Sequence, residues 1–295
     1  MIELNISYTL KKLMAVIGYD IPALAITLGV DSKSINSYLN KHSNPTISVI
    51  NKITKLIDDN GLDIYQLFDI NDDKEYLFHG SKTGGIIGKI STNRSKGFLN
   101  DFDNGFYLSD SLKNAINYVL DQKEPVIYRF KKEDVYKGNI YDFSKEKNGE
   151  IDWIIYIGLN RDKISNDDNK MFFKKHYDKK FAKYDLLKGE IADSYNFDVL
   201  NDFFNNIRDL EETRQALLLA NIGPQFVMKN EKYANELMWV DVYKIEKNLK
   251  DYLLNIVRRK KQILKENRDI FSNNHVFDWT LSFEEIKRKM KEEHE

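Results

Sequence analysis

The chain has 295 residues, in which 45 lysines and arginines nearly balance 46 aspartates and glutamates. This length predicts two domains, or one large domain with an appendage, and the balanced charge means that any basic surface for nucleic acid must be local. The chain contains no cysteine, which excludes disulfides, thiolate catalysis and cysteine-ligated zinc, and we expect a cytoplasmic protein. The first residues lack a basic segment and no apolar run reaches about 18 residues, so neither a secretory signal nor a membrane span is expected.

The first predicted domain, residues 1–70, has a helical pattern that is interrupted by glycines. Apolar residues recur at helical spacing before Gly18 and again before Gly29, and a third helix is expected to be capped by Asp31 or Ser32. Two further short helices complete the domain. In number and spacing these helices resemble the helix-turn-helix domain of the Xre/Cro repressor family.

That resemblance implies a recognition helix that faces the major groove of DNA. The side chains that it would present to bases and phosphates are Ser32, Lys33, Asn36, Ser37 and Lys41. Residues 1–70, however, contain six lysines, no arginine, six aspartates and one glutamate, whereas a phosphate-binding domain usually has a basic face. Two roles stay open: weak or homodimer-dependent DNA binding, and binding of a protein partner such as an antitoxin.

The second predicted domain, residues 71–247, combines short β-prone runs with helices. Strands are expected at 76–78, 105–108, 125–130 and 225–228, and helices at 111–120 and 151–159. Runs this short and interleaved favour an α+β domain with mostly antiparallel strands over a doubly wound parallel sheet. A charged, helical C-terminal arm is expected over residues 248–295.

Two of these β-prone runs are rich in aromatic residues, and each is accompanied by one polar side chain and neighbouring glycines. The first contains His79 and the second contains Tyr107. Glycine lets a ligand approach the backbone closely, so the pair predicts a binding cleft rather than a core. Asp101 and Asp103 precede the second run and are expected to shape a turn or to orient the cleft.

Five segments, taken in order, resemble DUF3990, a bacterial family of unknown function that is similar to ADP-ribosyltransferases. These segments are Leu77–Ser81, Asp101–Tyr107, Asp152–Arg161, Asp185–Asp193, and the stretch from Gln225 to Leu237. The resemblance implies an all-α helix-turn-helix domain followed by an ADP-ribosyltransferase-like split antiparallel β-sheet domain with peripheral helices.

The same resemblance implies NAD as the substrate of a mono-ADP-ribosyltransferase. His79 would hydrogen-bond the adenosine ribose, the Gly80 backbone would meet the nicotinamide amide, and Tyr107 would stack on the nicotinamide ring. Cleavage of the glycosidic bond between nicotinamide and ribose passes through an oxocarbenium-like transition state. Stabilising this state depends on well-positioned groups and electrostatics more than on a strong base. The other residues that the resemblance places at NAD are Ser81, Asp103, Gly105, Phe106 and Arg161.

The third catalytic position departs from the His-Tyr-Glu pattern. Where transferases of that type have a glutamate at the start of a strand, this chain has Gln225. A glutamine keeps the hydrogen bond to ribose but cannot act as a base. This favours transfer of a single ADP-ribose, or a slow or inactive site, over polymer formation. The carboxylates expected to replace the missing one are Glu190 and Glu231.

Arg161 has two interpretations. Its guanidinium either meets the NAD pyrophosphate through its bidentate fork or forms an ion pair with Asp152 or Asp185. No histidine pair has the spacing of metal ligands, so no metal is expected.

Three functions follow from the sequence. The first is a mono-ADP-ribosyltransferase of the sort found in toxin–antitoxin or phage-defence modules. The second is a DNA-binding regulator whose NAD-binding domain is a sensor without turnover. The third is an NAD glycohydrolase.

Overall fold

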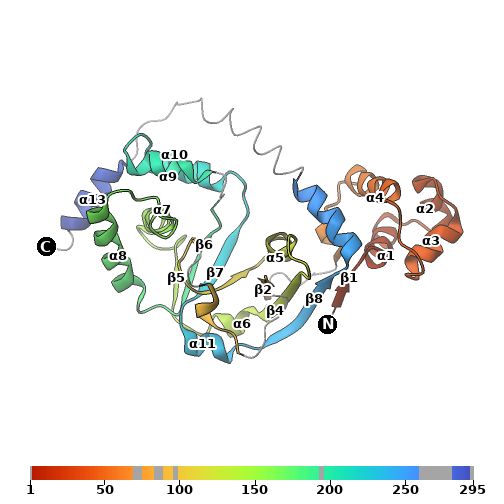
Figure 1. Cartoon of the computed structure of the whole chain (residues 1–295), viewed down its shortest axis with the longest axis horizontal. Coiled ribbons are helices and arrows are strands. Elements are labelled where there is room, and N and C mark those ends of the chain that lie inside the picture. The colour runs from red at the N-terminus through yellow and green to blue at the C-terminus, as the bar shows by residue number, and fades with distance from the viewer. Residues whose placement is uncertain are drawn as a thin grey trace. The chain divides into compact units, whose positions relative to one another are not determined.

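The computed structural model describes residues 2–68, 75–82, 89–95, 99–192, 196–258 and 281–292 (Figure 1). It is a mixed α/β structure with many helices, in agreement with the predicted α+β class. None of the helices in these ranges has the length and apolar character of a membrane span. The chain forms two compact units. Unit 1 comprises Met1–Gly85, Ser111–Phe130 and Trp239–Lys260, and unit 2 comprises Ile86–Asp110, Lys131–Met238 and Lys261–Glu295.

Unit 1 opens with a short strand and a group of helices, coloured red to orange in Figure 1. These elements are β1 (Ile2–Leu4), α1 (Ile6–Ile17), α2 (Ile21–Leu28), α3 (Ser32–Leu39), α4 (Ile47–Asp59) and the 3₁₀ helix η1 (Ile64–Phe68). Gly18 and Gly29 end α1 and α2 in the left-handed conformation, with φ of 71° and 61°. Asp31 caps α3, because its Oδ1 accepts a hydrogen bond from Ser34 N at 2.6 Å. The predicted helix ends are thereby confirmed.

The remaining described residues of unit 1 form strands and two helical segments. They are β2 (Tyr76–Ser81), α5 (Leu112–Val119), β4 (Val126–Lys131), β8 (Trp239–Ile245) and helical residues 247–258. The strands follow the order β1-β8-β4-β2, with β1 parallel to β8 and β4 antiparallel to β8.

One apolar core joins the N-terminal helices to these strands. Leu10 of α1, Phe78 of β2, Ile116 of α5 and Tyr243 of β8 all belong to it, and each is at most 2 % exposed. Leu253, from the segment 247–258, is fully buried in the same core. Unit 1 therefore includes residues on both sides of positions 70 and 247, where the sequence suggests domain boundaries. It does so because its apolar core is built from side chains of segments that are distant in the sequence.

In its described residues, unit 2 has four strands and a larger number of helices. Its elements are the 3₁₀ helix η2 (Thr92–Ser95), β3 (Phe106–Ser109), α6 (Lys132–Val135), β5 (Ile140–Asp142), α7 (Gly149–Asn160), α8 (Asp167–Phe181), β6 (Leu186–Glu190), α9 (Asp198–Phe204), α10 (Leu210–Leu218), β7 (Pro224–Met228), α11 (Glu231–Glu236) and α13 (Phe283–Glu292). The strands follow the order β3-β7-β6-β5. β7 is antiparallel to both neighbours, and β5 is parallel to β6.

The core of unit 2 is rich in aromatic rings. Phe173, Tyr177 and Phe181 recur every four residues along α8, so they lie on one face of that helix, and all are at most 5 % exposed. The buried carboxylate of Asp152 on α7 accepts hydrogen bonds from Tyr177 Oη at 3.2 Å and from Lys180 Nζ at 2.5 Å. These bonds supply the charge and donors that a carboxylate inside an aromatic core requires.

Gly80 allows β2 to lie against α5 within unit 1. A Cβ added there would be 2.6 Å from the carbonyl oxygen of Ala115 and 2.8 Å from Cγ1 of Val119. The backbone oxygen belongs to a helix and cannot move away as a side-chain end would. Gly80 is therefore required for packing, whatever it does for a ligand.

We predict that Gly80→Ala lowers the free energy of unfolding by about 1–3 kcal/mol, because the added methyl group forces α5 away from β2. Urea unfolding followed by circular dichroism measures this. Lys82→Ala, two residues further along at an exposed position, is the control and should change it by less than about 1 kcal/mol. Equal stability of Gly80→Ala and the unchanged protein would contradict the close approach.

Candidate functional site

Asp101 is the centre of a buried polar network in unit 2. Its side chain is 4 % exposed. Arg161, at the end of α7, donates to Asp101 Oδ1 through Nη2 at 2.6 Å and Nε at 2.9 Å. Gln225 of β7 donates from Nε2 to Asp101 Oδ2 at 2.8 Å, and Ala192 donates its backbone N–H to the same oxygen at 3.4 Å. One carboxylate thus joins segments that are far apart in the sequence.

The turn that follows Asp101 is held by the hydroxyl of Tyr107. Tyr107 Oη donates to the carbonyl oxygen of Asp103 at 2.6 Å and accepts from Phe102 N at 3.2 Å. Burial, and then the charge of Asp101, raise the pKa of the Tyr107 phenol well above its ordinary value. The phenol therefore stays protonated, which its donor role in the turn requires. Asp103 adopts the left-handed conformation, with φ of 61°.

Lys229, just after β7, also stabilises this turn by hydrogen bonds. Its Nζ donates to the carbonyl oxygens of Phe102, at 2.8 Å, and Asn104, at 2.5 Å. It also lies 3.7 Å from the carboxylate of Asp103. Burial lowers the pKa of the Lys229 ammonium, although the charge of Asp103 counteracts this effect. The sequence analysis did not single out this lysine, and no local motif marks it, since its partners lie more than a hundred residues earlier.

Gly105 and Phe106 serve the packing of β3. A Cβ at Gly105 would lie 2.3 Å from Cγ1 of Val227 and 2.9 Å from the carbonyl oxygen of Met228. Ser95 Oγ accepts from Gly105 N at 2.8 Å and donates to Gly105 O at 3.0 Å. Phe106 is 5 % exposed. Close packing therefore explains the glycine at position 105, and burial explains the apolar ring at position 106.

Gln225 and Glu190 lie on opposite faces of the unit 2 strands. Gln225 is paired with Gly189 on β6, so the two share a face, and Glu190 follows Gly189 and points the other way. Gln225 shares its face with Tyr107, because Tyr107 is paired with Val227, two residues further along β7. Burial, and then the charge of Asp110, raise the pKa of the Glu190 carboxyl. Gln225 and Glu190, the two candidates for the third catalytic position, therefore point to opposite faces, and one cannot take the place of the other.

Glu231 has a structural role at the start of α11. Its Oε2 accepts hydrogen bonds from Thr92 N and Thr92 Oγ1, both at 2.6 Å, and these bonds lower the pKa of its carboxyl. The carboxylate is thus engaged in capping η2.

The structure assigns Arg161 a partner that sequence reasoning did not name. Its guanidinium pairs with Asp101, donates to the carbonyl oxygen of Leu99 and lies 4.7 Å from the ring centre of Phe197. The expected alternative partners are otherwise engaged: Asp152 pairs with Lys180, whereas Asp185 accepts from backbone and amide N–H groups.

The remaining NAD-binding candidates lie in unit 1. His79 is half-buried on β2, and Gly80 and Ser81, which follow it, are buried. Tyr107, Asp103, Gln225 and Arg161 are thus brought together around Asp101 in one unit, and His79, Gly80 and Ser81 belong to the other. Asp193, the last residue of the fourth DUF3990-like segment, lies outside the described residues.

The predicted DNA-contacting side chains are mostly exposed on α3. Ile35 and Leu39 are its buried residues, whereas Ser32, Lys33 and Asn36 are exposed. The Ser37 and Ser43 hydroxyl oxygens are 2.7 Å apart, and beyond the helix Lys41 forms an exposed ion pair with Glu3, also at 2.7 Å.

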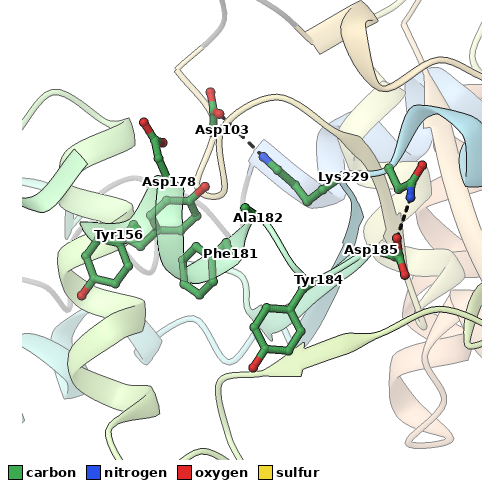
Figure 2. Close-up of a pocket in the computed structure, with 10 residues that line it drawn as sticks. Asp103, Tyr156, Asp178, Phe181, Ala182, Tyr184, Asp185 and Lys229 are labelled. Carbon is green, nitrogen blue, oxygen red and sulfur yellow. Dashed lines mark hydrogen bonds and ion pairs between the residues drawn. The ribbon is translucent and has the colours of Figure 1, made fainter. Parts of the chain in front are cut away.

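A pocket of about 310 Å³ lies beside the Asp101–Gly105 turn, within unit 2 (Figure 2). Aromatic rings from α7 and α8 and the loop after α8 form much of its lining, together with three carboxylates and Lys229. Among the described residues, no group of three or more histidine or acidic side chains is arranged to hold a metal ion.

Loss of the Asp101 charge should destabilise unit 2. Asp101→Asn leaves the half-buried Arg161 guanidinium without its counter-charge, which comes from a buried carboxylate, and we predict a loss of about 3 kcal/mol in the free energy of unfolding. Asp162→Asn is the matched control, because it removes an exposed ion pair with Lys170 and should cost less than about 1 kcal/mol. Denaturant titration of both variants checks the difference, and equal midpoints would refute the role of the network.

Comparison with known proteins gives a family for the chain. The model of the family described as "Protein of unknown function (DUF3990)" matches residues 76–239, which is more than half of the chain. No curated protein and no solved structure matches. The matched region spans β2 to the start of β8 and includes the whole network around Asp101. The chain therefore belongs to the DUF3990 family.

Proposed function

We propose that this protein binds NAD and transfers a single ADP-ribose to a macromolecular acceptor. The observation that carries the proposal is the convergence on Asp101. Four of the five segments that resemble DUF3990 contribute to it, through Asp101 itself, Arg161, the Glu190–Ala192 stretch and Gln225. A buried network of polar residues is less stabilising than apolar packing in its place, although breaking it is destabilising, and such departures are typical of functional sites.

The proposed reaction needs a rigid polar frame more than a strong base. The bond between nicotinamide and C1′ of the ribose breaks, nicotinamide leaves with the electron pair, and the acceptor forms the new bond to C1′ while losing a proton to solvent or a carboxylate. Positive charge develops on the ribose as that bond breaks. The turn at Asp103 is fixed by Tyr107 and Lys229 before any ligand arrives, which supports pre-organised stabilisation of this charge.

In this proposal Tyr107 of unit 2 supplies the ring against nicotinamide. Gln225 acts through Asp101, because its amide nitrogen is bound to that carboxylate. A Gln225→Glu exchange would set a second carboxylate against Asp101, so the variant is expected to repel Asp101 rather than to gain activity. The carboxylate nearest to the Gln225 position is therefore Asp101, with Glu190 on the opposite face.

A regulatory role is the second candidate, and the exposed face of α3 favours it. Ser32, Lys33 and Asn36 project from a helix that buries Ile35 and Leu39, the arrangement that a recognition helix needs. In that case unit 1 would bind DNA as a dimer or hold an antitoxin, and NAD would be sensed without turnover.

The test is incubation of the protein with NAD carrying a label in its adenosine half, with and without cell lysate. A labelled macromolecule together with released nicotinamide is the expected result. Free ADP-ribose without a labelled acceptor would identify a glycohydrolase, and binding heat without nicotinamide release would identify a sensor. Absence of binding, labelling and release would refute NAD chemistry altogether.

We predict that His79→Ala abolishes NAD binding under each of these functions, because the ribose loses its hydrogen-bond partner. His42→Ala, at an exposed position of unit 1, is the matched control and should leave binding unchanged. Titration calorimetry with NAD measures both variants. Unchanged affinity in His79→Ala would remove the histidine from the site.

A further inference from the structure

The pocket beside the Asp101–Gly105 turn carries an excess of negative charge. Its lining includes the carboxylates of Asp103, Asp178 and Asp185 against one ammonium, that of Lys229, which leaves two negative charges in excess. NAD carries two phosphates, so this lining would repel it. The pocket therefore suits a ligand of the opposite charge.

Two of these three carboxylates have a lysine within 4 Å. Lys229 lies 3.7 Å from Asp103 but donates its hydrogen bonds to carbonyl oxygens of the turn. Asp178 has Lys174 at 3.3 Å, in an exposed pair that water screens. Asp185 accepts from Asn139 N at 2.9 Å and Asn230 Nδ2 at 2.6 Å, both neutral donors that add no positive charge.

Asp103 and Asp178 act on the same part of the pocket. The charges of both carboxylates, after burial, raise the pKa of the Tyr156 phenol, and both counteract the lowering of the Lys229 pKa. Figure 2 shows the carboxylates of Asp103 and Asp178 at the upper part of the view, with Lys229 reaching Asp103 from the right. A cation placed between them would be attracted by both.

Aromatic rings form the walls below these carboxylates. The ring centres of Tyr156 and Phe181 are 4.7 Å apart in an edge-to-face arrangement, and Tyr156 and Tyr177 are 5.4 Å apart. Tyr184 lies at the other end of the lining (Figure 2). The negative faces of aromatic rings attract organic cations, and a planar guanidinium also stacks on them.

We propose that this pocket binds the guanidinium or ammonium group of a basic side chain, with arginine as the better fit. Aromatic walls with acidic groups at one side match a flat cation on an apolar stem. A volume of about 310 Å³ is at the small end for ligand sites and suits one side chain. The inference concerns unit 2 alone and does not depend on the proposed NAD chemistry.

The test is titration calorimetry of the full chain, without NAD, using N-acetyl-arginine-N-methylamide as the probe. Its citrulline counterpart has the same shape without the charge, and we expect it to bind at least about tenfold more weakly. Agmatine and a blocked Gly-Arg-Gly peptide distinguish a free cation from an arginine in a chain: tighter binding of agmatine would assign the site to small cations, and tighter binding of the peptide would assign it to a protein partner. Equal affinity for the arginine and citrulline probes would overturn the proposal.

Two substitutions test the pocket itself. Asp178→Asn should weaken arginine binding by about tenfold or more, whereas Asp168→Asn, an identical charge change on the same helix outside the pocket lining, should leave it unchanged. Tyr184→Leu removes one aromatic wall at a half-buried position and should weaken binding while the protein stays folded by circular dichroism. Full affinity in both Asp178→Asn and Tyr184→Leu would show that the cation binds elsewhere.

Discussion

The ion pair between Asp101 and Arg161 is the constraint on which the arrangement of unit 2 depends. A carboxylate inside a protein needs a counter-charge and several donors, and Asp101 obtains them from the end of α7, from Ala192 after β6 and from β7. Because each donor comes from a different element, the pair fixes how the helix and the strands meet. It also fixes where the turn after Asp101 begins, and so where the hydroxyl of Tyr107 finds its acceptor on Asp103.

Two different chemical environments contact this turn. In the first, Tyr107 donates a hydrogen bond to the carbonyl oxygen of Asp103 and Gln225 donates one to the carboxylate of Asp101, and burial keeps the Tyr107 phenol protonated. The second is the aromatic pocket with its excess of carboxylates. Lys229 belongs to the lining of that pocket and donates its hydrogen bonds to the backbone of the turn. In the proposed functions the first environment concerns NAD and the second concerns a basic side chain, and Asp103 contributes to both.

The sequence predicted local structure better than the partners of buried charges. Glycines at 18 and 29 and an aspartate at 31 marked the helix ends correctly, and the four expected strands are β2, β3, β4 and β7. The strands β1, β5 and β6 were missed, since three residues or a mixed run such as Leu186–Glu190 carry little periodic signal. The strand β8 was missed as well, although its seven residues include several β-prone types. Asp101 was expected to shape a turn or to orient the cleft, and its buried partners were not predicted. Its partners lie 60 and 124 positions away in the sequence, and no local pattern reports contacts of that range.

In the proposed function, the buried hydrogen-bond network at Asp101 organises the surface that receives NAD. The most direct measurement is NAD affinity by titration calorimetry for the unchanged protein and for Asp101→Asn, at a temperature where circular dichroism shows both to be folded. The account predicts binding by the unchanged protein and an affinity at least about tenfold lower in the variant, equivalent to about 1.4 kcal/mol. A folded Asp101→Asn protein that binds NAD as tightly as the unchanged chain would contradict it.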